Sequence, residues 1–410
     1  MNKVYITGRG LVTPLGIGLP ENEKALREGK CGIEFVQEWA DQKIESTVAG
    51  VVPDFPVHPI ITRKLLRFCP LPAVMSVSAA AEAFAEAKLD LADIPAQRMA
   101  VISGVAGSYL PDAYANRDAY LANDRKVRHV SPCVVPRVMP SSAASNLSLL
   151  FGIKGETYDI SAACSSSAIC IINAARLIQH GLYDMVIAGG AEGLDWAQAL
   201  GFTAMRALST HYNATPHLAS RPFDRDRDGF VMSSGAGYVL LESEASMKRR
   251  GAVPVCEISG MASNSNATDM VVPDANASEA VMRASIAGAG LVPEDISYIN
   301  THGTATPIGD PIEIEAVKRV FGSRAVVNST KSNTGHMVGA TGAVEVIFTS
   351  LMQEKGFISK SLNLDNVDPA CDGVDFVREL RTGVNLRHAL SNAFAFGGSN
   401  ACVVLTGCRN

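Results

Sequence analysis

The sequence predicts an α/β fold, because segments typical of strands and of helices alternate along the whole chain. Short apolar runs such as residues 101–104, 185–190 and 238–242 are typical of strands, and segments with helical spacing lie between such runs. Apolar residues form 47% and charged residues 19% of the 410-residue chain. A sizeable core can therefore be buried, in one large domain or two medium ones.

Composition and charge argue against several classes of protein. The formal net charge of −5 argues against general nucleic-acid binding. No apolar run reaches the length of a membrane span, and residues 1–8 are predicted to form a strand and a turn instead of a signal peptide. The nine cysteines include no CxxC pair, which argues against a zinc cluster or a disulfide scaffold. We therefore expect a cytoplasmic protein without a metal site.

The first glycines raise a nucleotide-binding alternative. Gly8 and Gly10 form a Gly-x-Gly pair at the end of the first predicted strand, as in a dinucleotide-binding turn. Thr13 stands where the third glycine of that fingerprint belongs, and Pro14 interrupts the helix that should follow. An NAD(P)-dependent oxidoreductase therefore stays an alternative that the broken fingerprint disfavours.

Two basic clusters precede the middle of the chain, on either side of an alanine-rich helix expected at residues 73–87. The first consists of Arg63, Lys64 and Arg67, which share a helical face by their spacing, and the second of Arg125, Lys126 and Arg128. Solvated surface is the default interpretation of both clusters. A binding role depends on whether a partner is acidic.

The stretch around Cys164 organises the chain. Residues up to Ile160 suggest a buried strand, and residues 168–178 are predicted to form a helix that stops near Gly181. Cys164 then lies at the helix N-terminus, where unpaired backbone N–H groups favour negative charge. A thiol at such a place ionises more easily and becomes a better nucleophile. The alternative is a small buried cysteine, and this stretch alone does not decide between the two.

The alternation continues to the end of the chain. A short helix ending at residues 248–251 marks the expected division into halves 1–250 and 251–410. In the second half we expect strands at 296–300, 325–328 and 401–406 and helices at 311–321 and 340–355. The helix after Cys164 has a counterpart in the helix after His336, which hints at a duplicated unit.

Two histidines in the second half form a catalytic set with Cys164. His302 lies in the Thr- and Gly-rich stretch 300–307, and His336 ends the similar stretch 329–336, each after a strand-like run. A cysteine poised at a helix N-terminus together with two such histidines suggests covalent catalysis. The last motif, at residues 392–400, is a glycine-rich loop whose backbone N–H groups can face a developing oxyanion.

These motifs resemble those of the β-ketoacyl-acyl-carrier-protein synthases, the condensing enzymes of fatty-acid and polyketide assembly. The resemblance covers nearly the whole chain, from Ile6 to Asn400. It implies a thiolase-like fold of two similar halves, each with a mixed sheet covered by helices in layers αβαβα. It also implies a homodimer, or a heterodimer with a related ketosynthase-like subunit, and an acyltransferase that needs no cofactor because acyl carrier protein carries the substrates.

The resemblance assigns roles to residues of this sequence. Cys164 is the expected nucleophile, and His302 and His336 are expected to bind the malonyl thioester carbonyl and assist decarboxylation. Lys331 is expected to orient this site with Glu345 as its partner. The other assignments are an oxyanion hole and gate at Cys164, Phe396, Gly397 and Gly398, an acyl pocket near Phe202, and pantetheine contacts at Thr304 and Thr306.

Acyl carrier proteins are strongly acidic, so the two basic clusters become candidate docking sites under this resemblance. The pathway stays open. Residues 206–213 resemble the housekeeping type I synthases, whereas residues 164–167 and 310–313 resemble polyketide synthases, so both fatty-acid elongation and a dedicated pathway such as aryl polyene synthesis are candidates. A non-catalytic chain-length partner of a ketosynthase is the remaining alternative, which Cys164 and the two histidines disfavour.

One residue departs from the pattern that the resemblance leads us to expect. Ala395 stands where a glycine is usual between the two phenylalanines of the last motif. Because only glycine freely adopts positive φ, we expect the Cβ of Ala395 to restrict the gate loop.

Overall fold

The computed structural model describes residues 2–93, 95–107 and 109–408. The main strands of the first half are β1 (Val4–Thr13), β5 (Met99–Gly104), β6 (Thr157–Ile160), β7 (Met185–Glu192) and β8 (Gly235–Ser243). Those of the second half are β9 (Cys256–Ser265), β10 (Tyr298–Asn300), β11 (Val326–Asn328), β15 (His388–Phe394) and β16 (Ser399–Gly407). Together with β2 (Gly16–Ile17) and β13 (Asp375–Phe376), these strands make a twelve-stranded mixed sheet within the described residues.

The two halves of the sheet repeat one topology. In the first half β1 is antiparallel to β8 and β8 to β7, whereas β7 is parallel to β5 and β5 to β6. In the second half β9, β16, β15, β10 and β11 have the same relations in the same order. The halves join where β1 pairs with β9. The structure thus contains a duplicated unit, and the division into separate domains at residue 250 stays a prediction.

The helices complete this framework. Those of the first half are α1 (Leu19–Glu28), α2 (Gln37–Asp41), α3 (Arg63–Leu66), α4 (Leu71–Glu86), α5 (Pro111–Ala122), α6 (Val134–Val138), α7 (Ser142–Phe151), α8 (Ser166–Gln179), α9 (Trp196–Ala204) and α10 (Glu244–Arg250). Those of the second half are α11 (Ala275–Gly288), α12 (Gly309–Phe321), α13 (Lys331–Thr334) and α14 (Thr341–Lys355). Two small antiparallel sheets of two strands each, β3 (Ile33–Phe35) with β4 (Val48–Gly50) and β12 (Phe357–Ile358) with β14 (Arg381–Thr382), lie outside the main sheet.

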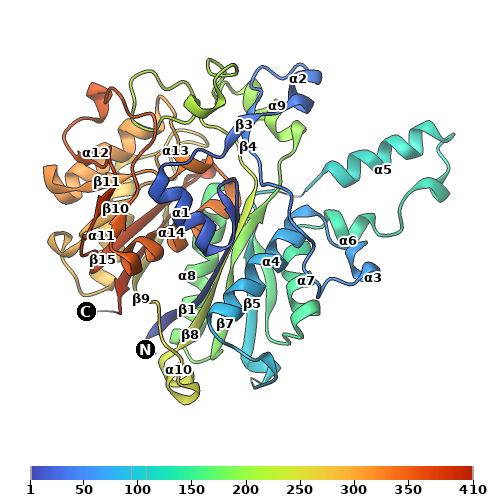
Figure 1. Cartoon of the computed structure of the whole chain (residues 1–410), viewed down its shortest axis with the longest axis horizontal. Helices are drawn as coiled ribbons and strands as arrows, with labels where there is room; N and C mark the ends of the chain where they lie inside the picture. The colour runs from blue at the N-terminus through green and yellow to red at the C-terminus, as the bar shows by residue number, and fades with distance from the viewer. Residues whose placement is uncertain (1, 94, 108, 409–410) are drawn as a thin grey trace.

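Three apolar cores define the layers. Helices α8 and α14 share the central core with strands of both halves, including Val186 of β7 and Val403 of β16. The outer core of the first half joins α4 and α7 to Ile187 of β7, and that of the second half joins α11 and α12 to Val404 of β16. Neighbouring residues of one strand thus point into different cores, as the two-residue period of a strand requires. Figure 1 shows α8 and α14 between the two sets of outer helices, which is the αβαβα layering that we expected.

The structure corrects two expectations about individual strands. β1 continues through Gly8 and Gly10 without a turn, because both glycines lie under α4: a Cβ at Gly8 would lie 2.0 Å from the carbonyl oxygen of Ala83, and one at Gly10 1.8 Å from that of Ala79. They permit close strand–helix packing, and the nucleotide-binding interpretation is wrong. β6 is not a buried strand either: it ends the sheet, and its residues are only partly buried.

No helix in the described part of the chain combines the length and the apolar character needed to cross a membrane.

Candidate active site

Cys164 lies at the turn between β6 and α8, as the sequence predicted. It occupies the middle of a single 3-10 turn, η4 (Ala163–Ser165), directly before α8. Ser166 fixes this turn: its hydroxyl accepts a hydrogen bond from the Ala162 N–H at 2.8 Å and donates one to the Ala163 carbonyl at 2.7 Å. Ala163 has a φ of 46°, in the left-handed region that is unfavourable for residues other than glycine. Such strained residues are common at functional turns.

The pKa of the Cys164 thiol is shifted upward, whereas its position at a helix N-terminus predicted a downward shift. Burial raises the pKa to about 11, although the charge of Lys331 and the backbone N–H of Phe396 both lower it. The expectation of an easily ionised thiol is therefore wrong for this arrangement of the site, because desolvation of the thiolate exceeds the favourable contribution of nearby positive charge. The sulfur is protonated at neutral pH and must lose its proton as it attacks.

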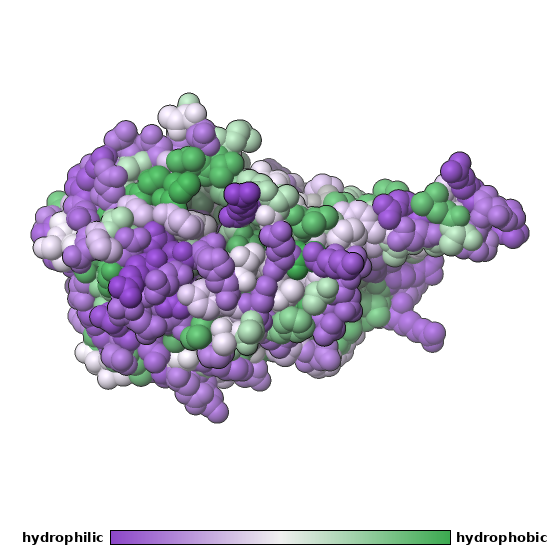
Figure 2. All heavy atoms as spheres, turned by 90° about the horizontal axis from the view of Figure 1, so that it is seen from above, coloured by the Kyte–Doolittle hydropathy of each residue, from purple (hydrophilic) through white to green (hydrophobic). Residues whose placement is uncertain are grey.

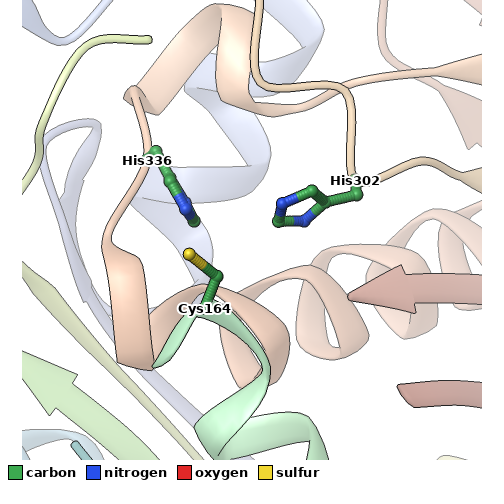
Figure 3. A group of neighbouring side chains, drawn as sticks. All are labelled: Cys164, His302 and His336. Carbon is green, nitrogen blue, oxygen red and sulfur yellow. The ribbon is translucent and has the colours of Figure 1, made fainter. Parts of the chain in front are cut away.

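His302 and His336 face the sulfur from the second half of the chain. The Cys164 Sγ and one ring nitrogen of each histidine all lie within 4.8 Å of one another, and Figure 3 shows the three side chains converging on one space. The two imidazole rings are nearly perpendicular, with centroids 5.4 Å apart. Burial and the charge of Lys331 lower the pKa of both histidines well below the usual range, so both rings are neutral.

The orientation of His336 is fixed by Thr341. Its Nδ1 shares a hydrogen bond with the Thr341 hydroxyl at 3.0 Å. Its other nitrogen, Nε2, is buried and has no hydrogen-bond partner among the described residues. That nitrogen is consequently free for a ligand that enters the space above Cys164.

Lys331 and Glu345 form a buried ion pair beside the histidines. The Lys331 Nζ donates to the Glu345 Oε1 at 2.6 Å, and both side chains are almost fully shielded from solvent. Burial raises the pKa of Glu345 to about 7, although Lys331 lowers it. The structure thus brings together the two residues that the family resemblance paired, from α13 and α14.

Two carboxylates that sequence reasoning did not assign to the site hold the His302 loop. The Glu313 carboxylate accepts the backbone N–H groups of His302 and Gly303, each at 2.7 Å. Asp310 accepts those of Thr304 and Ala305, each at 3.1 Å. Both acids come from the first half of α12, which directly follows the loop. The sequence feature that could have identified them is the presence of two acidic residues at the start of the helix that follows the His302 loop.

Phe396 closes one side of the site. It begins the turn η10 (Phe396–Gly398), and its ring lies 6.4 Å from the ring of Phe202, measured between centroids. Gly397 and Gly398 have φ values of 79° and 77°, which favour glycine. Ala395, however, has a φ of −122° and a ψ of 153°, which is ordinary extended backbone. Ala395 is therefore unstrained in this state, and the restriction of the gate loop by its Cβ stays a prediction.

One pocket joins these groups. Its lining includes Cys164, Phe202, His302, Thr304, Thr306, His336 and Phe396. The hydroxyls of Thr304 and Thr306 lie 3.1 Å apart and hydrogen-bond to each other. Exposed apolar side chains, including Met205, Val271 and Ile308, surround the mouth. Figure 2 shows apolar surface gathered around a hollow on the upper face of the molecule.

The two basic clusters lie outside this pocket. Arg63 and Lys64 belong to α3, Arg67 follows it, and all three are exposed. Arg125, Lys126 and Arg128 are exposed on the segment between α5 and α6. The Arg137 guanidinium of α6 donates to the Cys69 carbonyl at 2.8 Å, so the projecting α5–α6 arm contacts the chain just after α3 (Figure 1).

Family models settle the relationship of the chain. The β-ketoacyl synthase N-terminal domain matches residues 1–246, and the β-ketoacyl synthase C-terminal domain matches residues 255–365. The chain belongs to the β-ketoacyl synthase family. It is therefore an acyltransferase, and the two alternatives from other classes are not favoured.

Relatives match this ketosynthase from end to end. The 3-oxoacyl-[acyl-carrier-protein] synthase 1 of Haemophilus influenzae is 38% identical over 405 residues, covering 98% of each chain. The protein of the same name from Escherichia coli K12 is 39% identical over 407 residues, covering 99% of each chain.

Solved structures extend the comparison to the fold. A β-ketoacyl synthase from Burkholderia phymatum has a TM-score of 0.94 at 33% identity over the whole of both chains. The ishigamide ketosynthase/chain length factor has a TM-score of 0.92 at 26% identity, and a type II PKS acyl-carrier protein complex with its ketosynthase has 0.88 at 28%, each over the whole of both chains. The thiolase-like fold that the resemblance implied is confirmed.

Proposed function

We propose that this ketosynthase joins an acyl chain, held as a thioester on Cys164, to a malonyl unit on acyl carrier protein with loss of carbon dioxide. The product is β-ketoacyl-acyl carrier protein. The observation that carries the proposal is the convergence of one thiol and two neutral imidazoles in a single pocket, in a chain of this family.

In the first half-reaction Cys164 takes the acyl chain. Its sulfur attacks the acyl thioester, and the proton that it loses passes to the departing pantetheine sulfur. The backbone N–H groups of Cys164 and Phe396 both lower the thiol pKa and so lie close to the sulfur. Such donors stabilise the oxyanion of the tetrahedral intermediate. A thiol suits this step because it is both a good nucleophile and a good leaving group.

In the second half-reaction the histidines act on the malonyl unit. Loss of carbon dioxide leaves an enolate, and the negative charge gathers on the thioester oxygen. A neutral imidazole carries one ring N–H that can donate a hydrogen bond to that oxygen, and the lowered pKa values of His302 and His336 keep both rings in this form. The enolate carbon then attacks the acyl group on Cys164, and the sulfur leaves.

The remaining pocket residues have supporting roles in this proposal. Burial and the ammonium group of Lys331, which Glu345 holds in place, keep both histidine rings neutral. Phe396 moves aside to admit the malonyl unit, with Gly397 and Gly398 as the flexible part of the gate. Phe202 borders the acyl chain, and Thr304 and Thr306 contact the pantetheine arm. No cofactor or metal takes part in catalysis.

Acyl carrier protein and a second subunit are the proposed partners. The exposed basic clusters suit an acidic carrier. The outer edge of β6 has no neighbouring strand among the described residues, and the projecting α5–α6 arm exposes Leu121 and Val135. A second copy of this chain, or a related subunit, would cover both, because free strand edges and apolar surfaces favour association.

The proposed setting is cytoplasmic lipid synthesis. The relatives named synthase 1 favour fatty-acid elongation, and the polyketide ketosynthases among the structural neighbours keep a dedicated pathway such as aryl polyene synthesis as the second candidate. Mass spectrometry of the acyl chain retained on Cys164 after incubation with a panel of acyl carriers distinguishes the two, since each pathway supplies a different range of chains.

The central test is the Cys164→Ala variant. It should form no acyl-enzyme and carry out no condensation, while malonyl decarboxylation should continue because both histidines remain. Cys408→Ala, which alters an exposed cysteine far along the chain, is the matched control and should behave as the unmodified protein. Normal condensation by Cys164→Ala, or acyl label on the neighbouring Cys170, would show that the assignment is wrong.

A further inference from the structure

The side chains of Cys164, His302 and His336 have a property that the condensation reaction does not use. They offer one sulfur and two nitrogen atoms as electron-pair donors, all within 4.8 Å of one another. Cys164 lies 138 residues before His302, since 302 minus 164 is 138, and His336 lies a further 34 residues on, since 336 minus 302 is 34, so the set does not have the close spacing of a local metal-binding motif. Thiolate and imidazole are the ligands that zinc prefers in proteins.

The geometry suits a tetrahedral ion after a small contraction. With zinc–sulfur and zinc–nitrogen bonds of about 2.3 and 2.1 Å, ligand atoms lie roughly 3.3–3.6 Å apart. The donor atoms lie within 4.8 Å of one another and therefore have to approach by roughly 1.5 Å at most, which side-chain rotation can supply. Cys164 and His302 are only partly buried and line the pocket, so the fourth position of the ion faces the open space.

Independent features of the site favour a bound cation. His336 is 3% exposed, and its Nε2 is buried without a hydrogen-bond partner among the described residues. Thr341 holds Nδ1 of the same ring, as outer partners do for histidines that bind metals. The charge of Lys331, which lowers the pKa of both histidines, opposes an incoming cation, and the pairing of Lys331 with Glu345 offsets part of this repulsion.

We propose that the Cys164, His302 and His336 side chains bind one zinc ion, with water at the fourth position, and that the bound ion reversibly blocks the nucleophile. On binding, the sulfur–hydrogen bond of Cys164 breaks, a zinc–sulfur bond forms, and the proton leaves to the buffer. No electron is transferred. The ion occupies the space that the acyl thioester and the malonyl carbonyl need.

Cobalt titration provides a direct test that needs no catalytic assay. Co²⁺ takes the place of Zn²⁺ in such sites and gives a thiolate-to-metal charge-transfer band. The unmodified protein should show this band with one ion per chain, and Zn²⁺ should displace it. Zn²⁺ should also release one proton per ion in weak buffer and protect Cys164 from iodoacetamide. Mg²⁺, which prefers oxygen ligands, should do neither.

Variants separate this site from adventitious binding. Cys164→Ala should abolish the cobalt band, whereas Cys408→Ala should keep it. Thr341→Val should weaken zinc binding by about 10–100-fold, the usual effect of losing an outer hydrogen-bond partner, and Thr341→Ser should restore it. A band that persists in Cys164→Ala, or no band in the unmodified protein, would overturn the proposal. Either result leaves the condensation function untouched, because condensation is measured separately in the presence of a chelator.

Discussion

At the scale of single residues, burial decides the chemistry of this site. The Cys164 thiol is uncharged because desolvation raises its pKa, and the two imidazoles are uncharged because desolvation and Lys331 lower theirs. A resting site made of neutral groups lets an uncharged acyl thioester enter an apolar pocket. Negative charge then develops only as the reaction proceeds, at positions that preorganised hydrogen-bond donors already face.

The histidine roles can be separated by half-reaction. His302→Ala or His336→Ala should slow malonyl decarboxylation by about a hundredfold or more, the scale of losing one oxyanion donor. Acyl transfer to Cys164 should suffer less, because backbone N–H groups stabilise that oxyanion. Pre-steady-state rates of the two half-reactions measure the difference. If both fall equally in a folded variant, the histidine is structural.

Asp159 should make stability depend on pH. It lies on β6 and accepts the Ala144 N–H at 3.1 Å, but burial raises its pKa from 3.8 to about 7. The folded protein thus binds this proton more tightly than the unfolded chain. The contribution of this group to stability is therefore present below about pH 4 and is lost as pH rises to 7, by up to about 4 kcal/mol.

The variant Asp159→Asn isolates that effect. Asparagine keeps an acceptor for Ala144 and cannot ionise, so the free energy of unfolding should fall less between pH 5 and 8 than in the unmodified protein. Chemical denaturation at several pH values provides the measurement. Parallel pH curves for the two proteins would mean that Asp159 does not control this dependence.

At the scale of elements, close packing of helices on strands carries the site. The acids of α12 hold the His302 loop, Thr341 at the start of α14 holds His336, and η4 presents Cys164 before α8. Helices α8 and α14 pack together in the central core, so the two halves of the catalytic set meet through one apolar layer. Changes that separate these elements should damage the site without touching its residues.

The contact between β1 and α4 offers a test of this packing. A Cβ at Gly10 would lie 1.8 Å from a backbone oxygen of α4, which cannot move aside cheaply. Gly10→Ala should therefore lower the free energy of unfolding by at least about 1–3 kcal/mol, the usual effect of overpacking a core. Gly201→Ala is the matched control: nothing lies within 4 Å of the added atom, and alanine favours its helix. Denaturant midpoints should move in opposite directions, and equal midpoints would contradict the packing argument.

At the scale of the whole molecule, charge and shape determine which partners approach the pocket. The chain carries a net charge of −5, so a basic area is a local feature against an acidic background. The second cluster lies on the arm between α5 and α6, and Arg137 of α6 ties the base of this arm to the segment after α3, the helix that carries the first cluster. Such an area attracts an acidic carrier over a range set by the ionic strength.

Charge reversal tests docking. Arg67→Glu or Lys126→Glu should raise the KM for acyl carrier protein and reduce its salt dependence, while activity on an acyl-pantetheine stays nearly unchanged. The control is Lys154→Glu. Lys154 is exposed and precedes β6, so it lies at the opposite end of that strand from Cys164. Equal damage with both substrates would exclude a docking explanation.

The sequence by itself determined the local structure and the family. The strand–turn–helix around Cys164, the alternation of elements and the glycine-rich loops depend on periodicity and on residues close together in the chain, and these are visible without coordinates. The motifs at Cys164, His302, Lys331 to His336 and Phe396 were sufficient to name the family. The same local signals suggested a turn at Gly8 and Gly10 and a buried strand up to Ile160, and both were wrong.

Only the tertiary structure decided the properties that depend on distant neighbours. It showed that Gly8 and Gly10 pack under α4, that β6 is an edge strand, and that Glu313 and Asp310 hold the His302 loop. It also reversed the expected direction of the Cys164 pKa. The physical reason is the same in each case: desolvation, close contact and strand pairing depend on which segments meet in space, and a helix N-terminus seen in sequence carries no information about how deeply it is buried.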